Sequence, residues 1–416
     1  MAKVMPWGET LKVLLDAGFI ANVFTLDFSF LDGPDVLDGT TDFVDVTEYV
    51  LSVGITRGRT DQLRSNFQPG VCQIVLDDRA SGRAFDPANT ASPYYEGDYG
   101  IGPRRYMQVY AGTAGDEPLF VGRVQDLDIE YAQPNISTCT IVGVDDMADF
   151  AKTTLRAFTP SQQLTSARVN AILDRPEVSY STATRAISTG VATLGTFAYA
   201  DGDSVAGALQ EVAESEDGRF FVSRGGTATF QSRIGFTFQT PVTSFSDAGT
   251  AIPYQSLDVL YGSETLWNSA TITTKGNAVG TATDATSISE YGISNYSLNS
   301  LPLLNATEAT SLADNLVLKY KEPLSRFVQI GIVMNGLTAS QIETLDSLEI
   351  GDVLSVTKTF SVGSPSSVTQ DVFVERIAHQ ITPGIHQLTV GIGQAQLLTY
   401  FILNQDELND TRVRLG

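Results

Sequence analysis

The sequence predicts a mainly β protein with α+β insertions, in which two related β-barrel domains flank a small mixed α/β middle region. Three observations predict this class. Short apolar runs bounded by Gly, Pro, Asp and Asn fill residues 23–150, helical spacing takes over in residues 151–235, and strand-like runs return in residues 323–394. With 416 residues, 42% of them hydrophobic, the chain is long enough for two or three domains with apolar cores.

The first predicted barrel covers residues 23–150 and follows an N-terminal arm, residues 1–22. Its clearest strand continues past Gly122 and contains the apolar residues Phe120, Val121, Val124, Leu127 and Ile129. Two long polar connections, residues 59–70 and 80–103, separate the strands. Loops of this length in a compact barrel usually carry contacts to other molecules, so we expect contact surfaces there.

Residues 151–235 are predicted to form a small α+β domain with helices and a hairpin. Thr159 is the expected N-cap of a first helix, with Pro160 at its first position. Asp203 is the expected N-cap of a second helix. The inward faces of the two helices are predicted from apolar residues at helical spacing, which are Leu164, Val169, Ile172 and Leu173 in the first and Val205, Leu209, Val212 and Ala213 in the second.

A β-hairpin follows the second predicted helix. Two strand-like runs, residues 219–224 and 227–232, flank the pair Gly225-Gly226. Because glycine adopts positive φ at little cost, this pair predicts a two-residue turn between the two strands.

Residues 236–322 are predicted to be a β-rich segment that ends in a connecting helix. Asn305 and Glu308 have the spacing of a capping box at the start of that helix. Its expected inward face consists of Ala309, Leu312, Ala313 and Leu316. The second barrel is predicted at residues 323–394, and residues 395–416 form a C-terminal tail segment.

The second strand region repeats the first in outline. The run Ile101-Gly-Pro103 leads to a strand at residues 119–124, and Ile350-Gly-Asp352 leads to one at residues 372–377. In this match Arg123 corresponds to Arg376. We interpret the two regions as related barrels. A chain with two similar barrels makes geometric sense if three copies close into a ring, because the ring then offers six near-equivalent positions.

The charge balance argues against a protein that grips nucleic acid. The chain has 48 acidic and 26 basic residues, a formal net charge of -22, whereas phosphate contacts need fields of Lys and Arg. The N-terminus lacks a secretion signal, and no apolar run is long enough to cross a membrane. We therefore expect synthesis in a cytoplasm without stable membrane insertion. Cys72 and Cys139 lie in apolar runs and are expected to be buried free thiols.

No motif of catalytic or cofactor-binding chemistry occurs in the sequence, and a non-enzymatic protein is predicted. His379 and His386 lie seven residues apart, but a metal site would also need carboxylate or thiolate partners that the sequence does not place beside them. No metal is therefore expected. Asp145, Asp146 and Asp149 are expected to cap the helix that follows them rather than to form a carboxylate site.

Arginines concentrate in the first predicted barrel of this acidic chain. Ion pairs within the chain and contacts with acidic groups of a neighbouring subunit are equally compatible with this pattern. Two tyrosines of the long loop join the arginines as candidates. The interface candidates are Arg57, Arg59, Arg79, Tyr94, Tyr95, Arg104, Arg105 and Arg123.

The order of the segments resembles that of the tail hub proteins of long-tailed bacteriophages, which are also called minor tail or tail-associated proteins. In the first barrel the resemblance lies in the runs 45–59, 71–79, 101–110, 119–129 and 138–146. Further along it lies in Trp267-Asn-Ser-Ala-Thr-Ile-Thr273, Ser287-Ile-Ser-Glu-Tyr-Gly292, the helix 313–318 before Pro323 and Arg326, and Leu348-Glu-Ile-Gly-Asp-Val353. Each segment is unspecific alone. Their shared order and spacing carry the resemblance, which spans most of the chain.

The resemblance implies a homotrimeric hub at the tail tip of a siphophage virion, similar in fold to the baseplate hub of contractile-tailed phages. Such a hub adapts the sixfold tail tube or distal tail ring to threefold symmetry and closes or lines the DNA ejection channel. The implied partners are the distal tail protein ring, the tape measure protein and other tail tip or fibre proteins. DNA would pass through the lumen without specific binding, and an acidic lumen would let it slide.

Two alternatives to a phage hub come from the same observations. A glycan-binding or glycan-cleaving tail protein would use Tyr94, Tyr95, Tyr291 and carboxylates such as Asp145 and Asp146. Cleavage would require two carboxyl groups about 5 to 9.5 Å apart in a groove. A hub of a bacterial secretion or injection system would share the fold and differ in genetic setting. Many phage hubs continue into a host-binding region, so host recognition is expected to belong to other proteins here.

Overall fold

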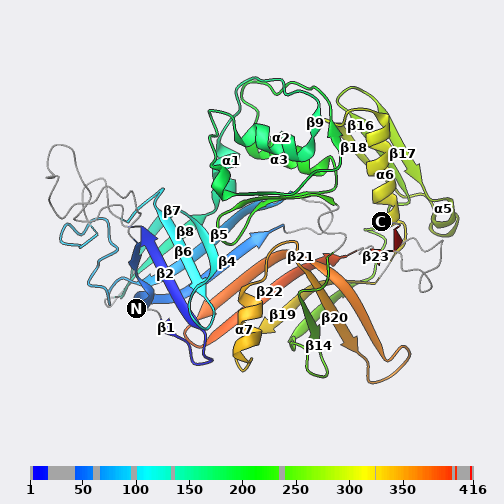
Figure 1. Cartoon of the computed structure of the whole chain (residues 1–416). Helices are drawn as coiled ribbons and strands as arrows, with labels where there is room; N and C mark the ends of the chain where they lie inside the picture. The colour runs from blue at the N-terminus through cyan, green and yellow to red at the C-terminus, as the bar shows by residue number, and fades with distance from the viewer. Residues whose placement is uncertain are drawn as a thin grey trace.

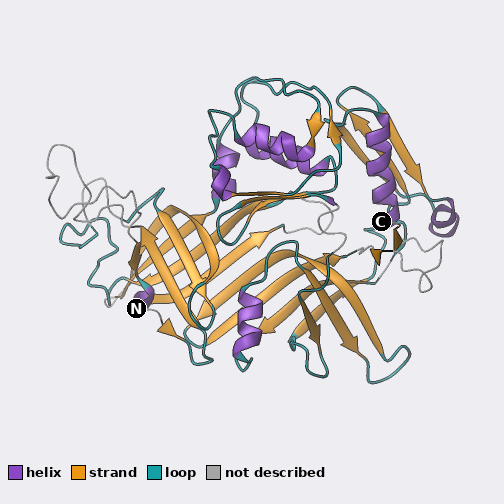
Figure 2. Ribbon diagram, in the orientation of Figure 1, coloured by secondary structure: helices purple, strands orange, loops and turns teal. Residues whose placement is uncertain are grey.

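The computed structural model describes residues 3–16, 43–59, 66–94, 101–132, 136–233, 239–323 and 325–395, together with the two short strands at 399–400 and 413–414. A curled sheet of 14 strands dominates the molecule, and a unit of helices and short strands lies above it in Figures 1 and 2. This architecture confirms the predicted mainly β class with α+β insertions.

The first half of the large sheet, called here the first half-barrel, is built from six main strands. They are β2 (Thr10–Asp16), β4 (Val50–Gly58), β5 (Gln68–Asp77), β6 (Tyr106–Ala111), β7 (Glu117–Ala132) and β8 (Ile136–Val144). Three short elements accompany them, β1 (Lys3–Val4), β3 (Phe43–Asp45) and a 3-10 turn at Thr47–Tyr49. Alternate residues of these strands point inward, and side chains such as Val109, Phe120 and Ile141 form a fully buried core.

The second half-barrel is built from six strands and one helix. They are β14 (Thr243–Ser246), β15 (Ser256–Leu260), β19 (Arg326–Val333), α7 (Ala339–Asp346), β20 (Val353–Thr359), β21 (Ser367–Thr382) and β22 (Ile385–Gln394). Its core is separate from the first and includes Phe245, Ile330 and Val390. Two short strands near the end of the chain, β23 (Thr399–Tyr400) and β24 (Val413–Arg414), pair with each other.

The two half-barrels share one strand order. It is β2-β6-β7-β8-β5-β4 in the first and β14-β20-β21-β22-β19-β15 in the second, and the matched strands also follow one another identically along the chain. One orientation differs, because β2 is antiparallel to β6 whereas β14 is parallel to β20. The shared order confirms, at the level of topology, that the two barrels are related.

A bulge in the longest strand of each half-barrel aligns the two copies residue by residue. β7 and β21 both contain 16 residues. The register of β7 with β8 shifts at Gln125, and the register of β21 with β22 shifts at Glu375. The bulges therefore match residue 125 with residue 375. In this alignment Arg123 corresponds to residue 373, three residues before Arg376, which was its partner in the sequence-based match. An apolar alternation of period two repeats too often to fix such a register.

The segments of the large sheet differ in extent from the predicted domains. β2 lies in the predicted N-terminal arm, residues 1–22, and pairs with β6. β14 and β15 lie in the predicted segment 236–322, and they pair with β20 and β19 of the second half-barrel. The second half-barrel is therefore interrupted in the chain by the residues between β15 and β19. The remaining domain boundaries stay predictions.

A middle unit lies above the sheet and packs two segments of the chain around one core. The first segment contains α1 (Asp146–Lys152), β9 (Gln163–Leu164), α2 (Thr165–Leu173), a 3-10 turn (Thr182–Thr184), β10 (Arg185–Ile187), β11 (Thr193–Leu194), α3 (Val205–Glu214), β12 (Arg219–Val222) and β13 (Ala228–Gln231). The second contains β16 (Ser269–Thr274), β17 (Val279–Thr283), α5 (Ala285–Tyr291), β18 (Asn295–Leu301) and α6 (Ala306–Tyr320). The shared core runs from Met147 to Tyr320.

The predicted hairpin of the middle unit is present with a longer turn. β12 and β13 are antiparallel, from Arg219 opposite Gln231 to Val222 opposite Ala228. The amide of Ser223 donates to the carbonyl of Thr227, so three residues form the loop instead of two. Gly226 alone among them has positive φ, +79°, as in three-residue hairpins that end in a left-handed residue.

Helix faces are predicted better than helix starts. The inward residues Val169 and Ile172 of α2, and Val205 and Leu209 of α3, are fully buried as expected. However, α2 begins at Thr165 without a side-chain cap. The six residues after Thr159 include the strand β9, which pairs with β11, because tertiary pairing overrides the local capping signal.

The N-caps of the other helices show which capping residues can be predicted from the local sequence. Ser204, not the predicted Asp203, caps α3, and Asp203 instead accepts from the amide of Ala200. Asn305 caps α6 by accepting from the amide of Glu308, although the Glu308 side chain does not complete the predicted capping box, and Asp145 caps α1. None of the helices in the described ranges is both long enough and apolar enough to cross a membrane.

Candidate assembly surfaces

Strand β4 joins the two half-barrels into one sheet. On one side it pairs with β5, and on the other it pairs with residues 376–381 of β21. The register of this joint runs from Gly58 opposite Arg376 to Val53 opposite Ile381. Figure 1 shows β4 and β21 at the centre of the molecule, between the blue and orange halves.

Gly58 permits close approach at one end of this joint. Its φ is +108°, and a Cβ at this position would lie 2.3 Å from the carbonyl oxygen of Glu375 and 2.7 Å from the Cα of Arg376. Both are backbone atoms, so neither can rotate away as the end of a side chain could. The joint therefore depends on glycine at position 58.

We expect Gly58→Ala to weaken the joint between the half-barrels. A matched control is Gly249→Ala, because Gly249 has a similar φ of +88° but open space around its Cβ position. The control should lose only the cost of a left-handed residue, about 1–2 kcal/mol. Gly58→Ala should lose about 1–3 kcal/mol more, because the new methyl group overlaps backbone. Equal unfolding midpoints in urea for the two variants would contradict this view of the joint.

A buried ion cluster around Glu375 ties the joint to the middle unit. Arg59 and Arg219 each place a guanidinium nitrogen 2.8 Å from Oε1 of Glu375. Burial alone would raise the pKa of Glu375, but the two guanidinium groups lower this pKa below its usual value. Arg59 follows β4, Arg219 begins β12 and Glu375 is the bulge of β21. The cluster therefore connects all three parts of the protein.

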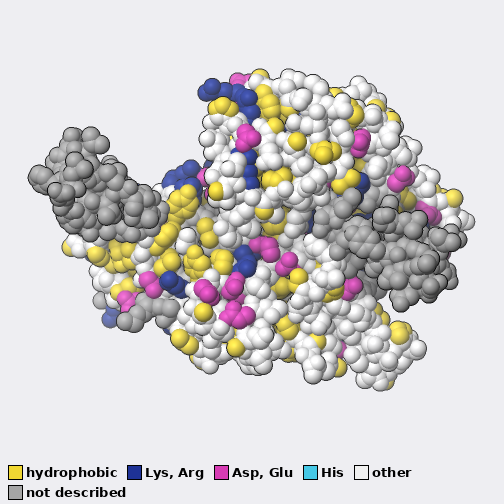
Figure 3. All heavy atoms as spheres, in the orientation of Figure 1, with side chains coloured by type: hydrophobic (Ala, Val, Ile, Leu, Met, Phe, Trp, Pro, Cys, Tyr) yellow, Lys and Arg dark blue, Asp and Glu magenta, His cyan; other side chains and the backbone are white. Residues whose placement is uncertain are grey.

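A second cluster at the joint centres on Glu349. Its carboxylate accepts from the guanidinium of Arg57 and from the backbone amide of Arg224, both at 2.7 Å. The Arg224 guanidinium in turn lies 2.7 Å from Glu117 at the start of β7. Figure 3 shows acidic and basic side chains next to one another near the centre of this face. Glu349, Glu375, Arg219 and Arg224 were not among the sequence candidates. A charged residue inside an apolar run, as in Val372-Phe-Val-Glu375, is the one signal that points to such a site.

Each half-barrel has one strand edge that lacks a partner although the equivalent edge of the other half-barrel is paired. In the second, β4 occupies the side of β21 that follows the bulge. In the first, the equivalent stretch of β7, residues 126–132, pairs with β8 alone within the described part of the chain. The counterpart of β4 is β15, which pairs there only with β19. These two strand edges are thus open in the described chain, and the joint between β4 and β21 shows how such edges fit together.

The open edge at β15 carries apolar side chains into solvent. Val259 is 50% exposed, Leu260 is 42% exposed, and Tyr261, directly after the strand, is 72% exposed. Soluble proteins usually protect sheet edges with charged residues or proline, because an open edge pairs readily with another chain. An exposed edge with a run of apolar side chains therefore indicates a contact surface.

The interface candidates from the sequence fall into two groups. Arg57, 2% exposed, and Arg59 are buried in the ion pairs described above, so the alternative of ion pairs within the chain holds for them. Arg104 is 67% exposed, and its guanidinium contacts Asp149 at 2.5 Å. Arg123 lies over the ring of Tyr106 at 4.1 Å and 3.5 Å from Asp149.

The other candidates lie in or near the long loop. Arg79 is exposed and Arg105 is half-buried. Tyr94 is half-buried and stacks on Phe85 with ring centroids 5.8 Å apart. Tyr95 lies outside the described residues. A role of these residues in contacts between subunits stays a prediction.

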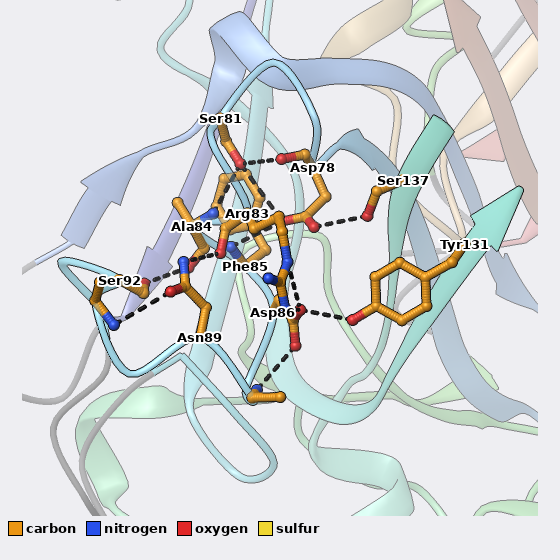
Figure 4. A network of polar contacts seen from close by, with 12 residues as sticks. Asp78, Ser81, Arg83, Ala84, Phe85, Asp86, Asn89, Ser92, Tyr131 and Ser137 are labelled. Atoms are coloured by element: carbon orange, nitrogen blue, oxygen red, sulfur yellow. Dashed lines mark hydrogen bonds and ion pairs between the residues drawn. The ribbon is translucent and has the colours of Figure 1, made fainter. Parts of the chain in front are cut away.

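The loop between β5 and β6 is held in place by two aspartates. Figure 4 shows Asp78 and Asp86 among the groups that they bind. Asp78 accepts from the Ser137 hydroxyl at 2.8 Å and from the amide of Phe85 at 3.0 Å. Asp86 pairs with Arg83 and accepts from the Tyr131 hydroxyl at 2.6 Å. The residues 78–92 are thus an ordered part of the first half-barrel and offer a defined surface for contact.

A pocket of about 640 Å³ lies between the first half-barrel and the middle unit and is lined by residues of both. Its lining includes Arg104, Arg123, Asp146, Asp149 and Tyr180. Asp146 accepts from the Tyr180 hydroxyl at 2.9 Å, so much of the charge in this pocket is paired within the chain.

Asp145 does not line this pocket. It is buried, accepts from the amides of Met147 and Gly70, and caps α1 as the sequence predicts. Burial raises its pKa to about 7, although the two amides oppose this shift.

Comparisons with known proteins find similar solved structures but no match by sequence. The sequence matches no protein-family model and no curated protein. The structure is similar to a tail protein from Neisseria meningitidis, with a TM-score of 0.59, 10% identity, and coverage of 93% of this chain and 97% of that one. It is also similar to a 43 kDa tail protein of prophage MuSo2 from Shewanella oneidensis, with a TM-score of 0.57, 12% identity, and coverage of 93% and 98%. The chain therefore has the fold of these two tail proteins over nearly its whole length.

Proposed function

We propose that this chain is a structural protein of a phage tail, and that three copies form a hub at the tail tip. The fold shared with two tail proteins supports the general class. The arrangement of three copies is supported by the repeated half-barrels, because three chains supply six similar units to a sixfold partner.

The joint between β4 and β21 carries the proposal. If β15 of one copy pairs with residues 126–132 of β7 in the next copy, each contact between chains repeats the contact within the chain. The half-barrels then alternate around a closed ring, and every half-barrel has the same two kinds of neighbour. A ring of six half-barrels adapts threefold symmetry of the chains to a sixfold tail tube or distal tail ring.

The proposed hub is a non-enzymatic assembly protein. Its partners would be the distal tail protein ring on one side, the end of the tape measure protein in the lumen, and fibre or other tail tip proteins outside. The net charge of -22 suits a channel for DNA, because an acidic lumen repels phosphate and lets the strand pass without binding. The corresponding expectation is that the purified protein does not bind DNA at low salt, where the repulsion is least screened.

The mass of the purified protein in solution tests the proposed trimer. We expect light scattering to give a mass near three times 44.7 kDa over a range of concentrations, and negative-stain averages to show a six-lobed ring. A dimer, or a protein that stays monomeric at the highest concentration, would contradict a self-assembling trimeric hub. The same sample provides the reference for the variants below.

A further inference from the structure

A buried group of histidines and carboxylates lies between the two half-barrels. It consists of Glu9 before β2, Asp346 at the end of α7, His379 in β21 and His386 in β22, and each side chain is at most 4% exposed. The two histidines project from neighbouring strands into the interior. Because Glu9 and His386 are 377 positions apart in the chain, only the fold brings these residues together.

The contacts in this group follow a pattern typical of metal ligands. Nδ1 of His379 lies 3.0 Å from Nε2 of His386. The other ring nitrogen of His386, Nδ1, lies 2.8 Å from Oε2 of Glu9. Glu9 is itself held by the indole N–H of Trp7, at 2.6 Å. A histidine that binds a metal usually donates its second N–H to a carboxylate in this way, which leaves the first nitrogen bare and correctly oriented.

Asp346 supplies the observation that an internal hydrogen-bond network does not explain. Among the described residues no side chain donates a hydrogen bond to its carboxyl oxygens, and the backbone amide of Gly112 is the one polar group directed at them, although the side chain is only 1% exposed. Ligand atoms of Asp346, His379 and His386 all lie within 4.8 Å of one another. A buried carboxylate without a side-chain partner is costly, and a cation between it and the two imidazoles would remove that cost.

We propose that Asp346, His379 and His386 bind a zinc-class divalent ion, with Glu9 as the carboxylate that orients His386. Two nitrogen ligands of a tetrahedral zinc ion lie about 3.3 Å apart, close to the observed separation of the ring nitrogens. Three protein ligands leave a fourth position for water. The sequence predicts no metal site because it places no carboxylate beside the two histidines. The structure places Asp346 and Glu9 there, so this prediction is replaced.

The ion would brace residue 9 of the first half-barrel against three elements of the second, which stiffens the joint without taking part in contacts between chains.

Metal analysis of the full chain tests the proposal. We expect protein produced with added zinc to contain about one zinc ion per chain, and Co²⁺ to replace it with the visible absorption of a tetrahedral site. Removal of the ion by a chelator should lower the melting temperature, and added Zn²⁺ should restore it. A chain that contains no stoichiometric zinc and whose melting temperature does not respond to Zn²⁺ would overturn the proposal.

Asp346→Asn separates a metal site from a simple hydrogen-bond network. Asparagine keeps the shape of aspartate, so the variant should fold, lose the bound ion and no longer respond to Zn²⁺. Glu9→Gln should retain the ion with about 10 to 100-fold weaker affinity. Glu343→Gln, on the same helix but bonded to Thr113, is the matched control and should bind as the wild type does. Wild-type zinc content in Asp346→Asn would rule out this ligand set.

Discussion

Glu375→Gln is expected to lower the free energy of unfolding by about 3–5 kcal/mol, because it leaves two buried arginines without their shared counter-charge. Glu375 is 5% exposed in its side chain and contacts both Arg59 and Arg219 at 2.8 Å. The carboxamide has nearly the same shape, so the loss reports the charge and not a cavity. Urea denaturation followed by tryptophan fluorescence and far-UV circular dichroism would measure it.

An exposed ion pair provides the control for this variant. Arg104 is 67% exposed and lies 2.5 Å from Asp149, which is 29% exposed, so Arg104→Gln should cost about 0–1 kcal/mol. A cost for Glu375→Gln within the same range would show that the buried cluster does not hold the joint. Such a result would also weaken the view that the middle unit is anchored to β21 through this carboxylate.

The difference between wild type and Glu375→Gln should depend on pH in a defined direction. The pKa of Glu375 in the folded protein is below 4.5, its ordinary value. A carboxyl group with a lowered pKa stabilises the fold fully above its unfolded-state pKa, and it loses this contribution as the pH falls through the folded-state pKa. The two melting temperatures should therefore be far apart at neutral pH and approach each other in acid. A constant difference across this range would contradict the ion-pair explanation.

The sequence predicts the strands of this protein well because their information is local. Apolar alternation such as that of Leu127 and Ile129 marks β7, and the repeated order of strand-like runs predicts two related barrels. Local glycine chemistry also places the hairpin at Gly226, although the loop has one more residue than expected. These features depend on residues within a few positions of one another.

Features that depend on distant residues could not be predicted in the same way. The bulges at Gln125 and Glu375 set the match between the halves, but a period-two pattern does not reveal a bulge. Arg57 pairs with Glu349, 292 positions away, and nothing in either neighbourhood indicates the other. The histidine cluster was missed for the same reason, since Glu9 and Asp346 reach it only through the fold.

Lysines on the open edge of β15 are expected to prevent assembly of the proposed hub without unfolding the chain. Val259 and Leu260 are 50% and 42% exposed in the single chain, so Val259→Lys with Leu260→Lys should leave the melting temperature nearly unchanged. In the ring the two side chains would lie in the contact with β7 of the next copy. Burying the exposed half of one such side chain contributes about 0.7–1.5 kcal/mol, so losing two should weaken association by at least about 10-fold.

A substitution of equal chemistry elsewhere makes this test specific to the edge. Val279 on β17 is also 50% exposed, and Val279→Lys should leave the mass in solution unchanged. If the β15 variant is monomeric and the control is a trimer, the contact between chains uses the edge that corresponds to β4. If both are trimers, three copies assemble through another surface, and the repeated joint is not the contact between chains. If neither the variants nor the wild type associate, the trimer itself is wrong, whereas the joint between β4 and β21 within one chain is unaffected.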